Sequence, residues 1–535
     1  MDYTILVGGA AGQGIDTVVH LLERTIKRHG YYIFTYKNFM SMVRGGHNFM
    51  QVRFSDKPLT SYSSKLDMIF ALNEETIMLH RDRLKPEGIV ILDNEIAKAE
   101  EFNHLPLTQI AKELNNQKVY PTVGFGALVN YFGLSLDIAE EVIDHVLGTK
   151  ISDINKQALH KGYNMLERKY NLEKKEDKHI LINGNQALAL GAIAAGCKYY
   201  CGYPMTPSSS VMTYMSTKAN EMGIVVDQIE DEVGALNMAL GASYAGVRAM
   251  TGSSGGGFAL MTEALSLAGI TEIPIVVFNA QRHGEFPRMV IALRSPDDAF
   301  YQTARAFNLA EKYQIPVLLM TEEYLTDYSM TIEPFDFGRI TIDRYLATED
   351  DVADERYKRY KFTESGISPR LIPGKVPGKV VLVDSHEHNE YGNIEENAEN
   401  RTKMMDKRMK KLEALMKEDI QEPWFIGVDN PENLIVCWGA TYGAVKETVD
   451  RLNNEGHSFG ALIYGDIWPF PTKTINKLGR IANNIIDIEQ NATGQLESLI
   501  NEKTSTKCSH RILKYDGRPF NADEIVERII CQIEL

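Results

Sequence analysis

The sequence predicts a multidomain α/β protein built on parallel sheets, and three observations between residues 181 and 282 predict it. First, short apolar, β-prone runs recur at 198–203, 224–229, 247–251 and 275–280. Second, a polar or glycine-rich turn follows each run. Third, a segment typical of a helix follows each of the first three turns. Strand, turn and helix in repeated order indicate a parallel sheet with crossover helices.

The polar turns carry side chains suited to a ligand site. They comprise Cys201–Ser209, Glu230–Ala235 and Thr251–Phe258. In parallel sheets the carboxyl ends of the strands meet at one edge, and ligands bind outside that edge. We therefore expect the three turns to build one site.

Glu232 begins a run of small and apolar residues: Ala235, Leu236, Ala239, Gly241, Ala242 and Ala245. A helix with so little side-chain bulk packs closely, which predicts a dry environment for its first carboxyl group. Burial disfavours the ionised form of a carboxyl group and keeps it able to donate a hydrogen bond. Thiamine diphosphate enzymes use such a glutamate at N1′ of the aminopyrimidine ring. For an isolated glutamate, an ordinary acidic first turn of a helix is the more frequent explanation.

In combination, these residues resemble the α subunit of the 2-oxoacid:ferredoxin oxidoreductases. Tyr203–Pro207 is similar to the family's Tyr-Pro-Ile-Thr-Pro motif. Glu232 stands where the family has its cofactor-activating glutamate, and Thr251–Phe258 is similar to the turn beside the cofactor. Gln281-Arg282 resembles the segment whose arginine holds the substrate carboxylate. The resemblance covers nearly the whole chain.

The resemblance implies a role for each position. Glu232 would activate thiamine diphosphate, while Thr206 and Arg282 would hold the substrate carboxylate, a contact that suits the guanidinium fork. The residues that would line the cofactor pocket are Tyr203, Pro204, Thr251, Ser253, Ser254 and Gly255. No metal ligand is expected in this chain.

The composition is that of an ordinary globular protein. The chain has 535 residues, of which 44% are hydrophobic and 24% charged, enough for about three or four domains with their own cores. A net charge of −15 argues against nucleic-acid binding. No apolar run is long enough to span a bilayer, and the N-terminus leads directly into a strand, so we expect neither a membrane anchor nor a signal peptide. Five scattered cysteines favour a reducing cytoplasm.

We expect four parts along the chain. Residues 1–170 form an α/β domain, and residues 179–334 form the domain of the thiamine diphosphate (pyrimidine) type. Residues 335–429 are a polar connecting segment with a charged helix. Residues 430–535 form a small α/β domain that resembles the C-terminal domain of transketolase-type enzymes. The charge-rich stretch 152–178 is typical of a solvated linker.

The first domain opens with a strand, a glycine-rich turn and a helix. Residues 4–14 carry the strand and turn, a pattern that indicates a phosphate or nucleotide cradle, although it is not G-x-G-x-x-G. The stretch is similar to the γ domain of the same oxidoreductases, which lies by the route of coenzyme A. The resemblance places Gly12, Gly14 and Arg44 on the coenzyme A side. Without it, Arg44 is a solvated arginine in a turn.

The polar segment has two distinctive features. His386 and His388 would share one face of a strand and could ligate a metal, but no third ligand is evident, so we favour a surface loop. Residues 397–417 predict a charged helix. Its apolar side carries Met404, Met405, Met409, Leu412 and Leu415, and we expect this side to pack on a neighbouring domain or subunit.

A complete thiamine diphosphate site also needs oxygen ligands for the Mg²⁺ that binds the diphosphate. The family supplies them from a Gly-Asp-Gly motif, which this sequence lacks; Gly465-Asp466-Ile467 has no second glycine. The sequence also lacks the C-x₂-C-x₂-C run of an iron–sulfur protein. We therefore expect a β subunit that carries the Mg²⁺ half-site and a [4Fe-4S] cluster, with the cofactor shared at the interface in a dimer of heterodimers.

The sequence departs from the family directly after Arg282. There the family has a Gly-Pro-Ser-Thr-Gly tract with a threonine near the substrate. In this chain His283–Pro287 follows at once and resembles the sequence after that tract. Either the tract is deleted or this sequence omits a segment of the protein. A true deletion would weaken the hold on the substrate.

Together these features predict a fused γ/α subunit of a cytoplasmic 2-oxoacid:ferredoxin oxidoreductase. The implied reaction is the coenzyme A-dependent oxidative decarboxylation of 2-oxoglutarate to succinyl-CoA and CO₂, with electrons passed to ferredoxin. Three alternatives stay open. They are the same chemistry on pyruvate or a branched-chain 2-oxoacid, a non-catalytic scaffold without its substrate loop, and a nucleotide-binding module led by residues 4–14.

Overall fold

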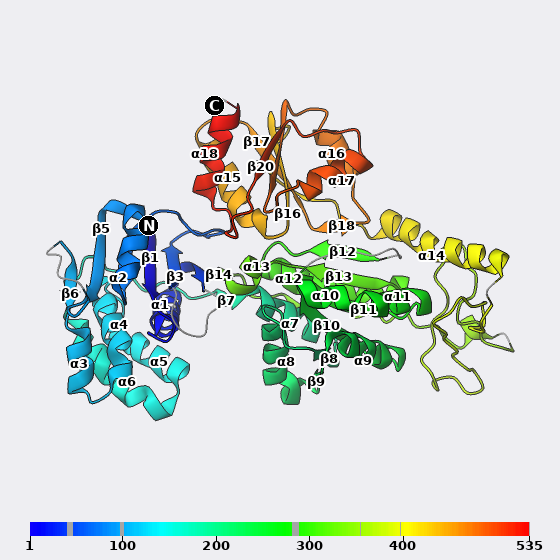
Figure 1. Ribbon diagram of the computed structural model, residues 1–535, viewed down its shortest axis with the longest axis horizontal. Coiled ribbons are helices and arrows are strands. Elements are labelled where there is room, and N and C mark those ends of the chain that lie inside the picture. Colours follow the sequence, from blue (N-terminus) through cyan, green and yellow to red (C-terminus); the bar gives the residue numbers. More distant parts are fainter. Residues whose placement is uncertain (40–46, 97–100, 281–287, 354, 396, 534–535) are drawn as a thin grey trace. The chain divides into compact units, whose positions relative to one another are not determined.

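The computed structural model describes the chain except for residues 40–46, 97–100, 281–287, 354, 396 and 534–535 (Figure 1). The chain forms two compact units. Unit 1 comprises Met1–Ile182, Tyr328–Pro334 and Asn521–Glu527, and unit 2 comprises Asn183–Asp327, Phe335–Phe520 and Arg528–Leu535. The finer division into four domains stays a prediction.

Unit 1 is built on an eight-stranded sheet in the order β6-β5-β4-β1-β3-β2-β14-β7. Its strands are β1 (Asp2–Gly9), β2 (Tyr32–Asn38), β3 (Asn48–Ser55), β4 (Leu66–Ala71), β5 (Leu84–Asp93), β6 (Asn103–Leu105), β7 (Ile180–Asn183) and β14 (Ser329–Ile332). Its helices are α1 (Ile15–Arg28), α2 (Glu74–His80), α3 (Leu107–Glu113), α4 (Tyr120–Tyr131), α5 (Leu136–Leu147) and α6 (Thr149–Tyr163).

The predicted strand, glycine turn and helix at the N-terminus are present as β1 and α1. Strand β1 lies between β4, to which it is parallel, and β3, to which it is antiparallel. Gly12 and Gly14 have φ angles of 89° and 84°, a left-handed conformation that glycine adopts without strain. A Cβ atom on Gly14 would also lie 2.7 Å from Pro121.

The predicted solvated linker at 152–178 is wrong for its first part, because residues up to Tyr163 belong to α6. Glycines let α6 approach α4 closely. A Cβ atom on Gly162 would lie 1.9 Å from the carbonyl oxygen of Val123, and one on Gly126 would lie 2.2 Å from that of Leu159. Charge content alone therefore did not distinguish this amphipathic helix from a linker.

Unit 2 contains a seven-stranded sheet in the order β18-β12-β13-β11-β10-β8-β9 and a five-stranded sheet in the order β15-β17-β16-β19-β20. The strands of the first are β8 (Tyr199–Gly202), β9 (Val225–Gln228), β10 (Ala249–Ser254), β11 (Ile275–Ala280), β12 (Met289–Ala292), β13 (Pro316–Met320) and β18 (Asp466–Trp468). Those of the second are β15 (Trp424–Gly427), β16 (Asn433–Trp438), β17 (Phe459–Tyr464), β19 (Asn484–Glu489) and β20 (His510–Leu513).

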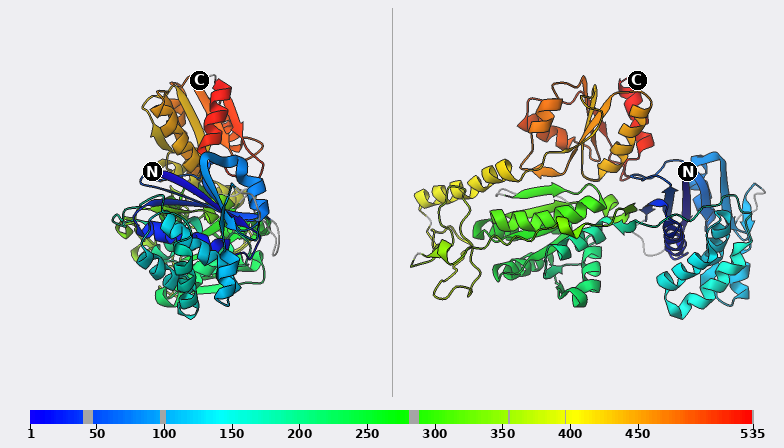
Figure 2. Two further views of the ribbon diagram at one scale, coloured as in Figure 1. Left: turned by 90° about the vertical axis from the view of Figure 1, so that its left-hand side faces the viewer. Right: turned by 180° about the vertical axis from the view of Figure 1, so that it is seen from behind.

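In this sheet the six neighbouring strands β12, β13, β11, β10, β8 and β9 are all parallel. This confirms the predicted fold class. The helices in this part of the chain are α7 (Gly184–Ala194), α8 (Ser209–Met222), α9 (Glu232–Tyr244), α10 (Gly255–Leu260), α11 (Thr262–Thr271), α12 (Pro296–Tyr313) and α13 (Glu323–Asp327). The later helices are α14 (Ala398–Glu418), α15 (Tyr442–Asn454), α16 (Lys473–Leu478), α17 (Gln495–Lys503) and α18 (Ala522–Ile533). Figure 2 shows the described part of residues 335–397 as long loops beside α14.

Helix α14 is held by a buried ion cluster. Glu272, at the end of α11, is fully buried, and its carboxylate accepts hydrogen bonds from Lys407 at 2.8 and 3.0 Å and from Lys411. The methionine side is buried only in part within this chain, so its packing on a neighbouring domain or subunit stays a prediction. Met405 and Met409 are 37% and 45% exposed, because the cations of α14 turn inward to neutralise Glu272. Of the predicted apolar side, Met404 and Leu415 are buried.

The same cluster corrects the prediction of a surface loop at 386–388. Glu387 and His388 are buried, Glu387 accepts a 2.7 Å hydrogen bond from Arg408, and the His388 ring stacks on Tyr360. His386 lies at the surface.

In the part of the chain that the structure describes, no group of three or more His, Cys, Asp or Glu side chains could hold a metal ion. Within the same residues, no helix is both long and apolar enough to cross a bilayer.

The five-stranded sheet buries a pair of carboxyl groups. Asp487 and Glu489 alternate on β19, so their side chains share one face, and both are fully buried. Trp438 and Asn491 donate hydrogen bonds to Glu489 at 2.9 and 2.7 Å. Burial, and then the neighbouring Glu489 carboxylate, raise the pKa of Asp487 well above its usual range.

We predict that Glu272→Gln lowers the free energy of unfolding by about 3–5 kcal/mol, because it leaves two buried lysines without a countercharge. Heat or urea unfolding of the purified chain measures the change. Glu399→Gln is the control, since Glu399 is an exposed carboxylate that pairs with Lys403 one turn along α14, and such pairs contribute less than about 1 kcal/mol. Equal effects of the two substitutions would contradict the prediction.

We predict that Asp487→Asn makes stability less dependent on pH. A raised pKa means that the folded chain keeps a proton which the unfolded chain releases, so folding weakens as pH rises above the usual carboxyl range. Asparagine removes this proton uptake. Unfolding midpoints between about pH 5 and about pH 8 should fall in the parent chain and stay flatter in the variant. Asp450→Asn, at a surface ion pair with Lys446, should keep the parent slope.

Candidate active site

The three predicted turns meet at one edge of the seven-stranded sheet. They lie at the carboxyl ends of β8, β9 and β10, which are parallel neighbours. The third predicted turn is wrong in part, because Thr251–Ser254 is the end of β10 and α10 begins at Gly255. Hydrogen bonds join the turns to one another. The Ile229 amide donates to the Gly202 carbonyl at 3.0 Å, and the Ser254 hydroxyl donates to the Thr206 carbonyl at 2.9 Å.

Glu232 lies at the centre of this edge. It is the first residue of α9 and is 3% exposed. The preceding residue, Asp231, caps the helix by accepting a 2.6 Å hydrogen bond from the Gly234 amide. The carboxyl group of Glu232 therefore has no capping role, and its Oε1 accepts a 3.3 Å hydrogen bond from the Ser253 hydroxyl.

A glycine in α10 covers the Glu232 carboxyl group. A Cβ atom on Gly257 would lie 2.2 Å from Glu232 Oε1 and equally far from Ser253 Oγ. Such distances are too short for any larger residue without movement of the carboxyl group. By contrast, a Cβ atom on the preceding glycine, Gly256, would have no neighbour within 4 Å among the described residues.

Two further polar side chains lie at this edge. Thr251 Oγ1 and Asn279 Oδ1 are buried and have no hydrogen-bond partner among the described residues. Buried polar atoms in folded proteins nearly always have partners. Unpaired atoms close to a buried carboxyl group fit a bound ring with polar substituents, such as the aminopyrimidine of thiamine diphosphate.

The other predicted site residues are exposed around Glu232 or lie outside the described residues. Tyr203 is 39% exposed, and Pro204 and Thr206 are exposed as well. Gly255 has a φ angle of 26° and open space around it. Arg282 lies outside the described residues, and so does Arg44 of unit 1. Gly12 and Gly14, the other predicted coenzyme A residues, lie in unit 1 at the turn before α1.

Sequence reasoning missed two residues at this edge, Asn279 and Glu322. Glu322 follows β13, whose next residue, Thr321, donates a 3.2 Å hydrogen bond to the Asn279 carbonyl. Burial raises the pKa of Glu322 to about 7, although a 2.6 Å hydrogen bond from Gln490 acts in the opposite direction and lowers it. The sequence did offer a signal for both: Asn279 is a polar residue inside an apolar strand, and Glu322 is a carboxylate just after another apolar strand.

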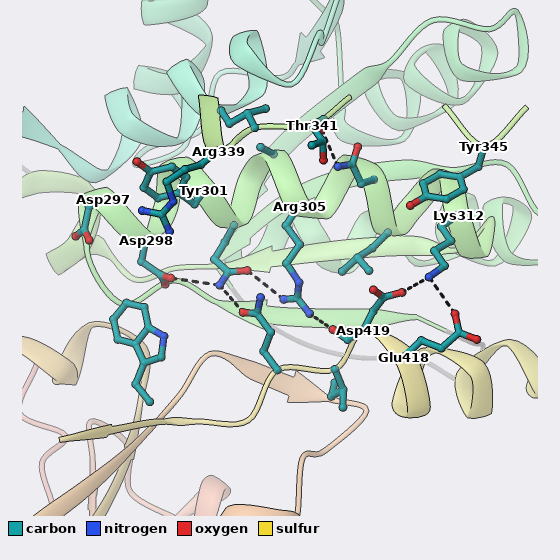
Figure 3. A pocket seen from close by; sticks show the side chains of 18 residues that line it. Asp297, Asp298, Tyr301, Arg305, Lys312, Arg339, Thr341, Tyr345, Glu418 and Asp419 are labelled. Carbon is teal, nitrogen blue, oxygen red and sulfur yellow. Dashed lines mark hydrogen bonds and ion pairs between the residues drawn. The ribbon is translucent and has the colours of Figure 1, made fainter. Parts of the chain in front are cut away.

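A separate hollow of about 700 Å³ runs along α12 (Figure 3). None of the predicted site residues lines it, and its charges are largely paired. Lys312 contacts Asp419 and Glu418 at 2.6 and 3.0 Å. Beside it, Arg305 donates two 2.7 Å hydrogen bonds to Asp466. The aspartate of the incomplete Gly-Asp motif is therefore held in a bidentate ion pair.

Consecutive parts of the chain match the models of three protein families. "Pyruvate ferredoxin/flavodoxin oxidoreductase" matches residues 4–165. The thiamine-diphosphate-binding part of pyruvate flavodoxin/ferredoxin oxidoreductase matches residues 190–288 and 283–407. "Pyruvate:ferredoxin oxidoreductase core domain II" matches residues 431–525. The second match breaks at the place where the sequence lacks the tract expected after Arg282.

Relatives cover the whole chain. Subunit alpha of a 2-oxoacid:ferredoxin oxidoreductase from Sulfolobus sp is 32% identical over 623 residues, covering 100% of this chain and 97% of the relative. The 2-oxoglutarate synthase subunit KorA of Methanothermobacter marburgensis is 29% identical over 378 residues, covering 66% of this chain and 99% of the relative.

A solved structure agrees with these matches. It is the 2-oxoglutarate:ferredoxin oxidoreductase of Magnetococcus marinus with 2-oxoglutarate, coenzyme A and succinyl-CoA bound. It has a TM-score of 0.91 and 29% identity to this chain, covering 99% of each. From its sequence, its fold and its thiamine-diphosphate-binding domain, the chain belongs to the α subunits of the 2-oxoacid:ferredoxin oxidoreductase family.

Proposed function

We propose that this chain is the fused γ/α subunit of an enzyme that converts 2-oxoglutarate, with coenzyme A, to succinyl-CoA and CO₂ and passes the electrons to ferredoxin. The KorA relatives and the ligands named for the Magnetococcus marinus structure support 2-oxoglutarate as the substrate. Pyruvate or a branched-chain 2-oxoacid is the alternative.

The observation that carries this proposal is the buried carboxyl group of Glu232. When bound, thiamine diphosphate supplies the nucleophilic carbon that decarboxylation of a 2-oxoacid requires. Glu232 holds a proton at N1′ of the aminopyrimidine, and Ser253 fixes the orientation of the carboxyl group. Gly257 and the close packing of α10 exclude water from it. A proton held in a dry, preorganised site is the arrangement that acid–base catalysis needs.

The remaining roles belong to the same proposal. Thr206 and Arg282 hold the substrate carboxylate, and Tyr203, Pro204, Thr251, Ser254 and Gly255 line the cofactor pocket. Gly12, Gly14 and Arg44 lie on the coenzyme A side. A β subunit supplies the Mg²⁺ half-site and a [4Fe-4S] cluster and passes electrons to ferredoxin. The name "subunit alpha" of the relatives supports such a partner.

Purification of the complex from its native source tests the assignment. Mass spectrometry would identify the co-purifying chain, metal analysis its iron and magnesium, and intact mass would show whether residues are missing after Arg282. Assays against 2-oxoglutarate, pyruvate and branched-chain 2-oxoacids would identify the substrate. If the lone chain proves active, or if no iron–sulfur subunit co-purifies, the proposal is wrong.

We predict that Glu232→Gln lowers the turnover of the assembled enzyme at least about a hundredfold, the usual minimum for losing a general acid–base group. Ferredoxin or dye reduction in the presence of 2-oxoacid and coenzyme A measures it. Glu230→Gln is the control, because Glu230 lies exposed in the same turn. Undiminished turnover in the Glu232 variant would refute its role.

We predict that Gly257→Ala lowers activity at least about tenfold and lowers stability by about 1–3 kcal/mol, because the added methyl group displaces the Glu232 carboxyl group or the α10 backbone. Gly256→Ala should change neither, since its methyl group would enter open space. Activity assays and thermal unfolding of both variants test this. Equal behaviour of the two alanine variants would show that the tight cover over Glu232 is unimportant.

A further inference from the structure

Asn279 is a buried polar residue in an otherwise apolar strand. It follows Ile275–Phe278 in β11 and is 1% exposed. Its Oδ1 atom has no hydrogen-bond donor among the described residues. A buried acceptor without a donor destabilises the folded chain unless a ligand completes it. The side chain therefore suits a donor group that is not part of the described chain.

The register of the sheet fixes the side on which Asn279 lies. Ser253 and Asn279 are paired residues of parallel strands, so their side chains point to the same face. The preceding pair, Gly252 and Phe278, occupies the other face, where a Cβ atom on Gly252 would lie 2.9 Å from the Phe278 ring. Asn279 thus shares a face with Ser253, the residue that donates to Glu232.

The residues paired with Asn279 on the two neighbouring strands, Ser253 and Met320, donate no hydrogen bond to its side-chain oxygen. The acceptors within reach of the Ser253 hydroxyl are Glu232 Oε1 at 3.3 Å and Met205 Sδ at 3.9 Å. On the other side, Met320 of β13 is paired with Asn279 and has no donor group. Thiamine diphosphate, the cofactor of the proposed function, has one nitrogen that carries hydrogen atoms, the exocyclic amino group of its pyrimidine. The same ring presents N1′ to Glu232 in that proposal.

We propose that Asn279 is a positioning residue whose side-chain oxygen accepts a hydrogen bond from the exocyclic amino group of thiamine diphosphate. The inference rests on the proposed function and adds a second fixed point to it. Glu232 at the start of a helix and Asn279 on a central strand both stand on rigid elements, which hold a ring more accurately than loops do. Together they select a ring that has an acceptor at one position and an amino group at another.

Binding to the assembled complex tests the proposal without any turnover. Dissociation constants are measured for thiamine diphosphate and for its analogue with hydrogen in place of the amino group. The parent complex should prefer thiamine diphosphate at least about tenfold, the effect of one buried hydrogen bond. Asn279→Ala should reduce this preference about tenfold. Asn279→Asp keeps an acceptor and should retain it.

Asn237→Ala is the matched control, because Asn237 is exposed on α9 and its amide donates only to the Val233 carbonyl of its own helix. It should leave the preference unchanged. If Asn279→Ala binds thiamine diphosphate with the parent preference, this inference is overturned and the proposed function stands. If the parent complex does not bind thiamine diphosphate at all, the proposed function fails, and the inference fails with it.

Discussion

The carboxyl group of Glu232 can remain where it is only because residue 257 has no side chain. The carboxyl oxygen and the Ser253 hydroxyl occupy the space that a Cβ atom would need. This contact requires that α9 and α10 both begin at the same sheet edge, and the parallel order of β9, β8 and β10 provides that. The small residues of α9 and the cap at Asp231 follow from the same constraint, since each lets the helix start close to the sheet.

Two of the buried glutamates of unit 2, Glu272 and Glu232, have opposite electrostatic surroundings. Glu272 is surrounded by lysine ammonium groups, which hold its pKa well below the usual range although burial alone would raise it. A carboxylate so fully paired serves to fix α14 in place. Glu232 is also buried, but among the described residues its side chain has a single hydroxyl partner, that of Ser253. A buried carboxyl group without a countercharge among these residues is available to hydrogen-bond a ligand.

Local pattern was enough to predict the strands but not the long-range pairs. The predicted run at 275–280 is a strand with those bounds, because this apolar run lies in the interior of a sheet. The buried side of α14 could not be predicted, since its partner Glu272 lies more than a hundred residues away in the sequence. The roles of Asn279 and Glu322 could not be predicted for a related reason. The groups around Asn279 come from a neighbouring strand, and the group that contacts Glu322 is Gln490, far along the chain. The roles of Arg44 and Arg282 stay predictions.

The proposal that this chain shares its cofactor with a β subunit is supported by the ion pairs that its charged groups already form. The edge around Glu232 offers hydrogen-bonding groups suited to an uncharged ring, and none of its described side chains is a cation. Asp466, in the incomplete motif, accepts hydrogen bonds from both terminal nitrogens of Arg305 and from the backbone amide of Gln421. Turning it toward Mg²⁺ would leave a partly buried guanidinium group unpaired, which is strongly unfavourable. The described residues of this edge thus offer groups that suit the ring of the proposed cofactor, and in the proposed function the β subunit binds its diphosphate tail.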